Sequence, residues 1–438
     1  MKKFYSLLLA ALFAMSTFAA DREHTLKVYN WADYIDEEVL KAFPAWYKQM
    51  TGEDVDVIYQ TFDINESMLT EIEVGHEDYD VICPSEYIIE RMLKAQLLKK
   101  IDKELIPADK RYFDNVAPFV VDKFQQMSET ENVSDYTVGY MWGTTGFIYN
   151  PKFVDREDLR SWGAILDPKF EGRIYMKDAF RDVYSVIVLY AYREEIARRE
   201  VTRDELVRDI TPERIARVEG ILTAAKDNVA GWEVDFGKEE MTKGKTWMNL
   251  SWSGDAQWAI DEAAEMGITL EYIIPDEGSN VWFDGWCIPK YAKNEKAASW
   301  FINYMCMPEN AIKNMDFIGY VSVIATPEVR EWIDDDQEWD EALDLTYFFG
   351  PDAKEVHANP VLYADKAVID RCALMHDAGE MNEELIKMWN RVKGDNLSPV
   401  MLAIIIVVLL TIIIFAVIQV LNNRKQQNLQ RKHRNKRR

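Results

Sequence analysis

The feature that most constrains the fold is an alternation of short β-rich runs with amphipathic helical runs near the N-terminus. The runs follow one another with little chain between them, and the first helical run stops at Gly52. They are, in order, Leu26–Trp31, Glu37–Met50, Val55–Phe62, Glu66–Val74, Asp80–Cys83 and Glu86–Leu98. A βαβαβα order predicts a parallel sheet with helices on both faces, and therefore an α/β fold.

The middle of the chain leaves this order and later returns to it. Tyr136–Asn150 predicts a pair of strands that cross into a second lobe. The later runs predict helices over Asp182–Tyr192, Glu205–Val229 and Glu295–Met307, and strands over Thr246–Trp252, Thr269–Pro275 and Trp282–Pro289. We therefore expect two lobes joined by two or more strands, with a ligand cleft between them.

Length supports two lobes, because a body of residues 21–395 exceeds the usual size of a single domain. We expect residues 21–140 to form the first part of lobe 1 and residues 141–275 to form lobe 2. Residues 276–395 should return to lobe 1 and add C-terminal helices, before a short polar linker at Lys393–Ser398.

The N-terminus has the pattern of a secretory signal. Residues 1–19 contain Lys2 and Lys3, an apolar run at Leu7–Met15, and small residues at Thr17 and Ala19, so cleavage near Ala19 is expected. An N-terminal anchor that stays uncleaved is the alternative.

The C-terminal segment predicts a membrane helix. Residues 399–421 carry no charge and are long enough to cross the hydrocarbon layer. Residues 422–438 hold eight lysines and arginines and no acid, which favours a cytoplasmic tail over a nucleic-acid-binding one. The body is then expected in the periplasm, anchored to the inner membrane.

Charge narrows the class of partner. The chain has 51 basic and 75 acidic side chains, and without the tail, Lys2 and Lys3 the body has 41 against 75, a net charge of −34. Such a surface disfavours nucleic acid and attracts cations, although it is also compatible with ordinary solubility.

Cysteines and catalytic motifs add little. Cys83, Cys287, Cys306 and Cys372 are widely spaced, which leaves open a disulfide or buried free thiols and suggests no metal site. No nucleophile elbow, phosphate-binding loop or zinc motif is present, so no catalytic residue and no cofactor are expected. An enzyme that uses Asp178 and Asp182 for acid–base work is the competing class, but it would need a buried acid with a raised pKa.

Aromatic and carboxylate side chains gather where predicted strands end. They are Trp31, Asp33 and Tyr34, then Ser85 and Tyr87, then Asp178 and Asp182, then Trp252 and Asp255, and finally Trp282 and Asp284. The spacing places Trp282 and Asp284 on one strand face and Asp178 and Asp182 one helical turn apart, and Ser85 is expected to cap a helix.

These residue types suit an organic diammonium. Carboxylates accept charge-assisted hydrogen bonds from its ends, and aromatic faces line its methylene chain and attract the ammonium groups. Taken singly, each tryptophan could instead be a core residue, and each aspartate a solvated residue or a cap.

Five stretches in order carry a family resemblance. They are YNWADY (Tyr29–Tyr34), YDVICPS (Tyr79–Ser85), MWGTTG (Met141–Gly146), WSGD (Trp252–Asp255) and WFD (Trp282–Asp284). From Leu26 to Lys393 the chain resembles the spermidine/putrescine periplasmic binding proteins of polyamine ABC transporters, within the bacterial extracellular solute-binding proteins. The resemblance implies the two-lobed periplasmic binding protein fold, with a polyamine as ligand and an ABC permease as partner.

The resemblance also implies residue roles. Trp31, Tyr34 and Ser85 would hold one amine end, Trp252 and Trp282 would enclose the methylene chain, and Asp182 and Asp284 would accept ammonium groups, with Asp178 nearby. Asp255 and Tyr320 match the putrescine-preferring branch, whereas Tyr87 matches the spermidine-preferring branch.

Two departures from the family pattern leave the choice between putrescine and spermidine open. Met375 or His376 stands where the spermidine branch has a glutamine, and Val234 replaces a polar residue. The expected function is capture of the amine by clamshell closure and delivery to the permease, with a membrane-tethered polyamine sensor as the alternative.

Overall fold

The computed structural model describes residues 22–234, 236–244, 246–334, 339 and 342–394, together with the single positions 407 and 411. The chain divides into two compact units, Met1–Leu385 and Ile386–Arg438. The expected signal at 1–19 and tail at 422–438 lie outside the described residues, as does the expected span at 399–421 apart from Val407 and Thr411. Within the described ranges, no helix is both long and apolar enough to cross a membrane.

The N-terminal strands form the predicted parallel sheet. β1 (Thr25–Trp31) pairs in parallel with β2 (Asp56–Phe62) and with β3 (Val81–Ile82). The helices between and after them are α2 (Glu37–Thr51), α3 (Asn65–Glu73) and α4 (Glu86–Lys94). α2 begins where the Asp36 carboxylate accepts the Glu38 N–H and ends at Gly52, whose φ of 79° suits glycine. The βαβαβα prediction is confirmed.

One boundary in this region was predicted wrongly. The helix expected to run to Leu98 ends at Lys94, and Leu98–Lys99 forms the short strand β4. β4 pairs with Ile288 and Pro289, which are remote in sequence, so a tertiary pairing decides the boundary.

Long strands join the two halves of the main sheet. β5 (Thr137–Tyr149) is one continuous buried strand and not the expected strand pair. Its residues Thr137–Thr144 pair with β10 (Ser279–Pro289), and Thr145–Tyr149 pair with β8 (Met248–Trp252). β9 (Glu271–Ile273) pairs with the end of β5, and β14 (Cys372–Leu374) runs parallel to the start of β10. The expectation of two or more crossing strands is confirmed.

The second half of the sheet is again parallel. β6 (Ile174–Lys177) lies between β8 and β7 (Val229–Glu233), which gives the order β2-β1-β3-β10-β5-β8-β6-β7. The single helix predicted over Glu205–Val229 is wrong. The segment forms α8 (Arg203–Arg208), α9 (Pro212–Ala224) and then β7, because Thr211 caps a new helix at Pro212.

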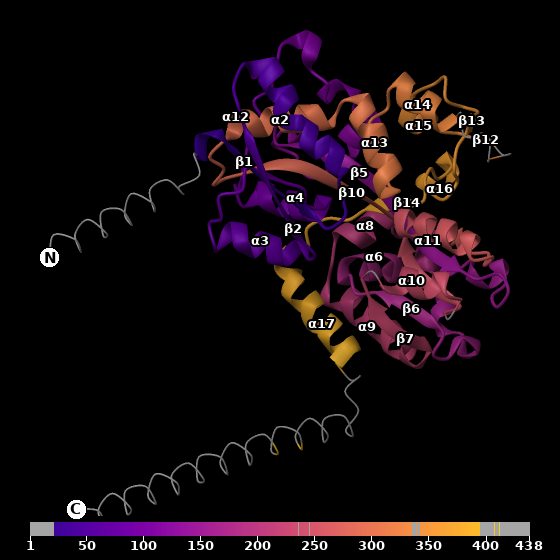
Figure 1. The fold of residues 1–438 in the computed structure, drawn as a ribbon. Helices are drawn as coiled ribbons and strands as arrows, with labels where there is room; N and C mark the ends of the chain where they lie inside the picture. The colour runs from indigo at the N-terminus through magenta and orange to yellow at the C-terminus, as the bar shows by residue number, and fades with distance from the viewer. Residues whose placement is uncertain are drawn as a thin grey trace, which may run out of the picture. The chain divides into compact units, whose positions relative to one another are not determined.

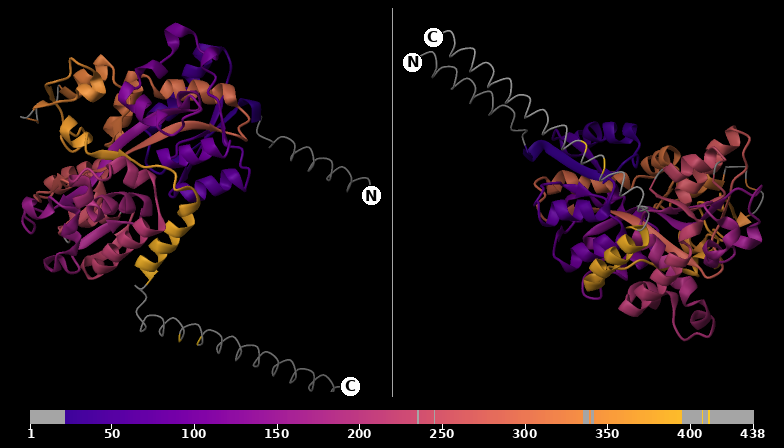
Figure 2. Two further views of the ribbon diagram at one scale, coloured as in Figure 1. Left: turned by 180° about the vertical axis from the view of Figure 1, so that it is seen from behind. Right: turned by 90° about the horizontal axis from the view of Figure 1, so that it is seen from below.

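We call β1–β4 and β11, with the helices around them, the first lobe, and β6–β9, with α6–α11, the second lobe. Figure 1 shows α2, α3 and α4 on one side of β5, β10 and β14 and α9, α10 and α11 on the other, and the views in Figure 2 keep the two groups apart. The remaining second-lobe helices are α6 (Phe180–Ala191), α7 (Arg193–Ala197), α10 (Phe236–Thr242) and α11 (Ser253–Glu265).

The other elements, together with short 3₁₀ turns, complete the part of the chain that the structure describes. They are α5 (Pro118–Gln125), α12 (Glu295–Met305), α13 (Pro308–Ile318), β11 (Val321–Ser322), α14 (Pro327–Asp334), β12 (Ala342–Leu343), α15 (Thr346–Phe349), β13 (Val356–His357), α16 (Lys366–Ile369) and α17 (Asn382–Gly394). α12 confirms the predicted helix that begins at Glu295. All four cysteines are buried free thiols, so no disulfide forms between them.

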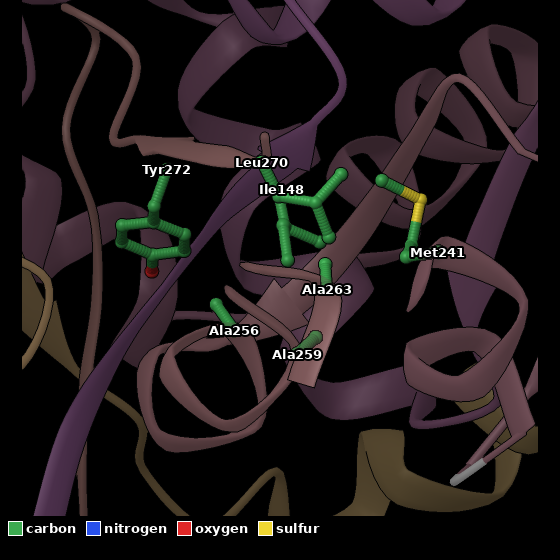
Figure 3. Close-up of a cluster of buried hydrophobic side chains, with 7 residues drawn as sticks. All are labelled: Ile148, Met241, Ala256, Ala259, Ala263, Leu270 and Tyr272. Atoms are coloured by element: carbon green, nitrogen blue, oxygen red, sulfur yellow. The ribbon is translucent and has the colours of Figure 1, made fainter. Parts of the chain in front are cut away.

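A buried apolar cluster holds α11 in the second lobe. Ala256, Ala259 and Ala263 are fully buried on one face of the helix and pack near Ile148 of β5 and Tyr272 of β9. Figure 3 shows Ala263 beside Ile148, with Met241 at one side of the cluster and Tyr272 at the other. The small alanine side chains let the helix approach the sheet closely, and this contact positions its first turn, which carries Asp255.

Candidate ligand-binding site

The site is built around a buried carboxylate on a crossing strand. Asp284 lies in β10 where its register against β5 shifts between Phe283 and Gly285. The Ser85 hydroxyl donates to Asp284 Oδ1 over 2.7 Å, and the Tyr34 hydroxyl donates to Oδ2 over 2.8 Å. Both donors follow strands of the first lobe. Burial raises the pKa of Asp284 to about 7, with a further contribution from the negative charge of Asp182, although the two hydroxyl donors oppose the shift.

This arrangement corrects the expected role of Ser85. The residue stands at the N-cap position of α4, but its side chain makes no capping hydrogen bond. Its hydroxyl donates a hydrogen bond to Asp284 instead, because a β-bridge between the two residues brings them together.

A second buried carboxylate comes from the second lobe. Asp182 lies in the first turn of α6 and accepts hydrogen bonds from Trp252 Nε1 at 3.1 Å and Asn280 Nδ2 at 3.0 Å. Burial raises the pKa of Asp182, although these two donors oppose the change. Across the part of the chain that the structure describes, neither Asp182 nor Asp284 forms an ion pair with a lysine or arginine.

Arg181 is the buried cation nearest to this group in sequence. It donates to the backbone carbonyl of His376, and its guanidinium lies 5.3 Å from the centre of the Tyr87 ring. Its charge favours ionisation of both Asp182 and Glu66 without contacting either as an ion pair.

A third carboxylate is already neutralised inside the protein. Asp255 accepts a hydrogen bond from Lys177 Nζ at 2.7 Å and one from the Tyr320 hydroxyl at 2.8 Å, and Lys238 Nζ lies 3.5 Å away. Burial acts to raise the pKa of Asp255, but the positive charges of Lys177 and Lys238 outweigh it and lower the pKa. Asp255 is therefore ionised and paired without any ligand.

Aromatic rings surround these carboxylates. The Trp282 and Tyr34 rings each lie 5.6 Å from the ring of Tyr320, and Trp31 packs 4.5 Å from Phe62 at the end of β1. The Nε1 atoms of Trp31 and Trp282 are buried and have no hydrogen-bond acceptor among the described residues.

Two glycines make room for the rings. A Cβ atom at Gly143 would lie 2.5 Å from the Trp282 ring, and one at Gly254 would lie 2.4 Å from the Tyr320 ring. Each distance is well inside van der Waals contact, so any larger residue would displace the ring. Gly143 of the MWGTTG stretch and Gly254 of the WSGD stretch thus each have a packing reason.

Side chains from both lobes meet in this region. The Tyr320 hydroxyl, next to β11 of the first lobe, contacts Asp255 of the second lobe, and Arg181 of the second lobe covers Tyr87 of the first. Asp182, Asp255 and Asp284 are 8%, 5% and 6% exposed. The lobes are therefore closed over the carboxylates.

The structure also places three further residues of the prediction. Asp33 is exposed in the turn after β1, with a φ of 51°. Asp178 precedes α6 and donates its backbone N–H to the Glu233 carbonyl, so the prediction that it lies one helical turn from Asp182 is wrong. Tyr87 is linked to the centre through Asn65, which donates to both the Tyr87 and the Ser85 hydroxyls, and through Arg181, whose guanidinium lies over the Tyr87 ring.

The two positions that depart from the family pattern have distinct surroundings. Met375 Sδ lies 3.5 Å from Asn280 Nδ2, next to Asp182. The His376 ring contacts Glu90 at 3.0 Å, and the Val234 carbonyl accepts a hydrogen bond from Lys177. Of Met375 and His376, Met375 is therefore the one whose side chain borders the site.

Sequence reasoning missed four residues of the site, namely Lys177, Asn280, Asn65 and Glu86. Glu86 is fully buried and accepts the Phe283 N–H, and burial holds its pKa well above the ordinary value. Lys177 is the last residue of strand β6. Strand ends are also the positions where the aromatic and acidic site residues were predicted. A lysine at a strand end could therefore have been predicted as a site residue from the sequence. No sequence pattern pointed to Asn65 or Asn280.

Comparisons with known proteins agree with this architecture. Residues 43–343 match the family described as "Bacterial extracellular solute-binding protein". The spermidine/putrescine-binding periplasmic protein of Escherichia coli (strain K12) is 29% identical over 324 residues, which cover 73% of this chain and 84% of that protein. The putrescine-binding periplasmic protein of the same strain is 28% identical over 351 residues, which cover 75% of this chain and 88% of that protein.

A solved structure shows the same fold. The spermidine/putrescine ABC transporter substrate-binding protein of Streptococcus pneumoniae matches with a TM-score of 0.61 at 25% identity, over 84% of this chain and 98% of that one. These relatives are all solute-binding proteins, not enzymes. This two-lobed α/β chain belongs to the bacterial extracellular solute-binding proteins.

Proposed function

We propose that the chain is the extracytoplasmic substrate-binding component of a polyamine ABC transporter. The observation that carries the proposal is a pair of buried carboxylates, Asp182 and Asp284, that come from the second lobe and from a crossing strand and have no cationic partner among the described residues. Two carboxylates without an ion-pair partner are costly to bury in their ionised form, and a ligand with two ammonium groups would neutralise both.

The surroundings of the carboxylates support the same ligand class. Trp252 and Trp282 would enclose a methylene chain, and Trp31, Tyr34 and Ser85 would surround one of its ends. Aromatic faces also attract ammonium groups by cation–π interaction. The names of the relatives from Escherichia coli and Streptococcus pneumoniae, which include putrescine and spermidine, agree with this assignment.

Clamshell closure is the proposed mechanism. In the open form a polyamine would enter between the lobes, and its ammonium groups would then pair with carboxylates from both sides. The closed form gains these contacts and the open form does not, so the ligand shifts the population toward closure. The closed protein would then deliver the amine to the permease.

The proposal includes lobe boundaries and a membrane tether. Boundaries near residues 140 and 275 are supported by β5 and β10, which pass between the lobes. The charge-free segment 399–421 and the basic segment 422–438 support an inner-membrane helix with a cytoplasmic tail, and the N-terminal pattern supports a periplasmic body.

Calorimetric titration of the purified full-length chain in detergent micelles tests the central claim. Putrescine, cadaverine or spermidine should bind with measurable heat at one site per chain. Butylamine, which has one ammonium group, should bind far more weakly because it leaves one carboxylate unpaired. A chain that gives no heat with any of the three polyamines would overturn the proposed function.

A further inference from the structure

Lys177 occupies a position that resembles a bound ammonium ligand. Its side chain is fully buried, and its Nζ lies 2.7 Å from Asp255 and 3.3 Å from Glu233. The same Nζ lies 4.3 Å from the centre of the Trp252 ring and donates to the Val234 carbonyl. A carboxylate together with an aromatic face is the arrangement that we assign to the polyamine ammonium groups.

Lys177 is linked to Asp182 and Asp284 through intervening side chains. Trp252 contacts Lys177 through its ring and Asp182 through its Nε1, so one side chain joins both. On the other side, Asp255 accepts from Tyr320, whose ring lies 5.6 Å from that of Tyr34, the donor to Asp284. The lysine therefore belongs to the wall of the site and not to a separate part of the core.

Lys177 brings its own positive charge to this part of the site. Among the described residues it pairs with Asp255 and Glu233, and Lys238 Nζ also lies 3.5 Å from Asp255. A further ammonium group here would meet two lysines in a buried environment, where repulsion between like charges is strong. Of the three buried aspartates of the site, Asp182 and Asp284 are the two that form no ion pair with a lysine or arginine in the part of the chain that the structure describes, so we expect them to pair with the cargo.

We propose, on the basis of the proposed function, that Lys177 is a specificity-determining residue whose own ammonium fills a third cation position. The chain then selects amines with two ammonium groups over amines with three. Putrescine is the probe of the first class and spermidine of the second.

The substitution Lys177→Met tests this inference, because it removes the ammonium and keeps a long unbranched side chain. Asp255 and Glu233 then need a cation, which the third ammonium of spermidine would supply. Titrations of the full-length chain in detergent micelles should show the ratio of the spermidine Kd to the putrescine Kd falling by about tenfold or more, since a contact between charged groups is worth about that factor.

Lys169→Met is the matched control. Lys169 also contacts two carboxylates, Asp158 at 2.7 Å and Asp167 at 3.3 Å, but its side chain is 41% exposed and lies on the surface. Lys169→Met causes the same change in net charge as Lys177→Met, so an effect of bulk charge would appear in both variants. We expect the Kd ratio of Lys169→Met to equal that of the wild-type chain.

The double variant Lys177→Met/Asp255→Asn removes both members of the ion pair. Its Kd ratio should return toward the wild-type value, because the carboxylate that would receive a third ammonium is gone. Circular dichroism of each variant reports whether it is folded.

The outcomes separate this inference from the proposed function. A wild-type chain that binds no polyamine refutes the proposed function itself. A wild-type chain that binds spermidine more tightly than putrescine refutes the role of Lys177, whether or not the variants fold. A folded Lys177→Met variant in which both affinities change by the same factor also refutes it, because a purely structural lysine would act in that way.

Discussion

Asp284 illustrates at the residue scale how a binding site stores unfavourable charge. Its two hydrogen-bond donors, Ser85 and Tyr34, are neutral and come from loops that follow β1 and β3. They orient the carboxylate without supplying a positive charge. The cost of burial therefore remains until a cation enters, and the ligand gains this energy when it binds.

Asp284→Asn should weaken putrescine binding by about 2–5 kcal/mol, because it leaves a buried ammonium group without its counter-charge. Calorimetry on the full-length chain measures the loss. Asp122→Asn, at an exposed position of α5, serves as the control and should bind like the wild-type chain. An Asp284→Asn variant with unchanged affinity would remove Asp284 from the site.

The raised pKa of Asp284 predicts a pH dependence of binding. Burial is its main cause and lifts it from 3.8 to about 7, so below pH 7 the carboxyl holds a proton that the cationic ligand must displace. Affinity for putrescine should fall by up to about tenfold per pH unit below 7 and level off above it. Titrations between pH 5.5 and 8.5 measure this slope, and Asp284→Asn should flatten it. An equally steep slope in that variant would assign the proton to another group.

The same shift has the opposite sign for the stability of the unliganded protein. Between its ordinary pKa and about 7, the folded state holds more protons at Asp284 than the unfolded state. The contribution of this group to the free energy of unfolding is therefore fully present at low pH and is lost as the pH rises through 7. At a pH where Asp284 is ionised and binding is strongest, this group therefore contributes least to the free energy of unfolding of the unliganded protein.

At the scale of the elements, the placement of the site depends on how closely α11 packs on the sheet. Ala256, Ala259 and Ala263 are fully buried in one cluster with Ile148 and Tyr272, and each contributes only a methyl group to it. The first turn of the same helix carries Asp255 and Gly254, which contact Tyr320. The helix α11 therefore both packs in the core and positions Asp255 in the site.

Ala259→Leu should lower the free energy of unfolding by about 1–3 kcal/mol, because a larger side chain does not fit this face. It should also weaken putrescine binding by displacing Asp255 relative to Tyr320. Ala264 is exposed on the same helix, and Ala264→Leu should change stability by no more than about 0.5 kcal/mol. Urea unfolding and calorimetry measure both effects, and equal losses in the two variants would contradict the packing argument.

At the scale of the whole molecule, closure and topology are the properties that matter for transport. The contacts of Tyr320 with Asp255 and of Arg181 with Tyr87 join the lobes across β5 and β10. Each contact links a polar group of one lobe to a group of the other, so water can replace the lost partner when the lobes open. Such an interface suits the opening that we propose.

Protease added to intact spheroplasts tests the proposed topology. The body should be digested while an epitope placed after Arg438 stays intact, because a basic flank directly after an apolar span remains in the cytoplasm. Detergent permeabilisation is the control and should expose the epitope. Digestion of the epitope with a surviving body in intact spheroplasts would reverse the assigned orientation.

The sequence by itself determined the α/β class, the N-terminal βαβαβα order and most of the residues around the carboxylates. It did so because apolar periodicity and the chemistry of strand ends are local properties of the chain. It also predicted a cationic cargo, since aromatic and acidic residues recur together. It left undecided the choice between putrescine and spermidine.

Only the tertiary structure decided which buried carboxylates of the site have a lysine partner. Lys177 and Asp255 are 78 residues apart, and Ser85 and Asp284 are 199 apart, so no local pattern shows that the first pair is neutralised or that the second is not. The continuous strand β5 and the early end of α4 are likewise set by pairing with β10. The energy of a buried charge depends on its neighbours in space, and those neighbours exist only once the sheet has formed.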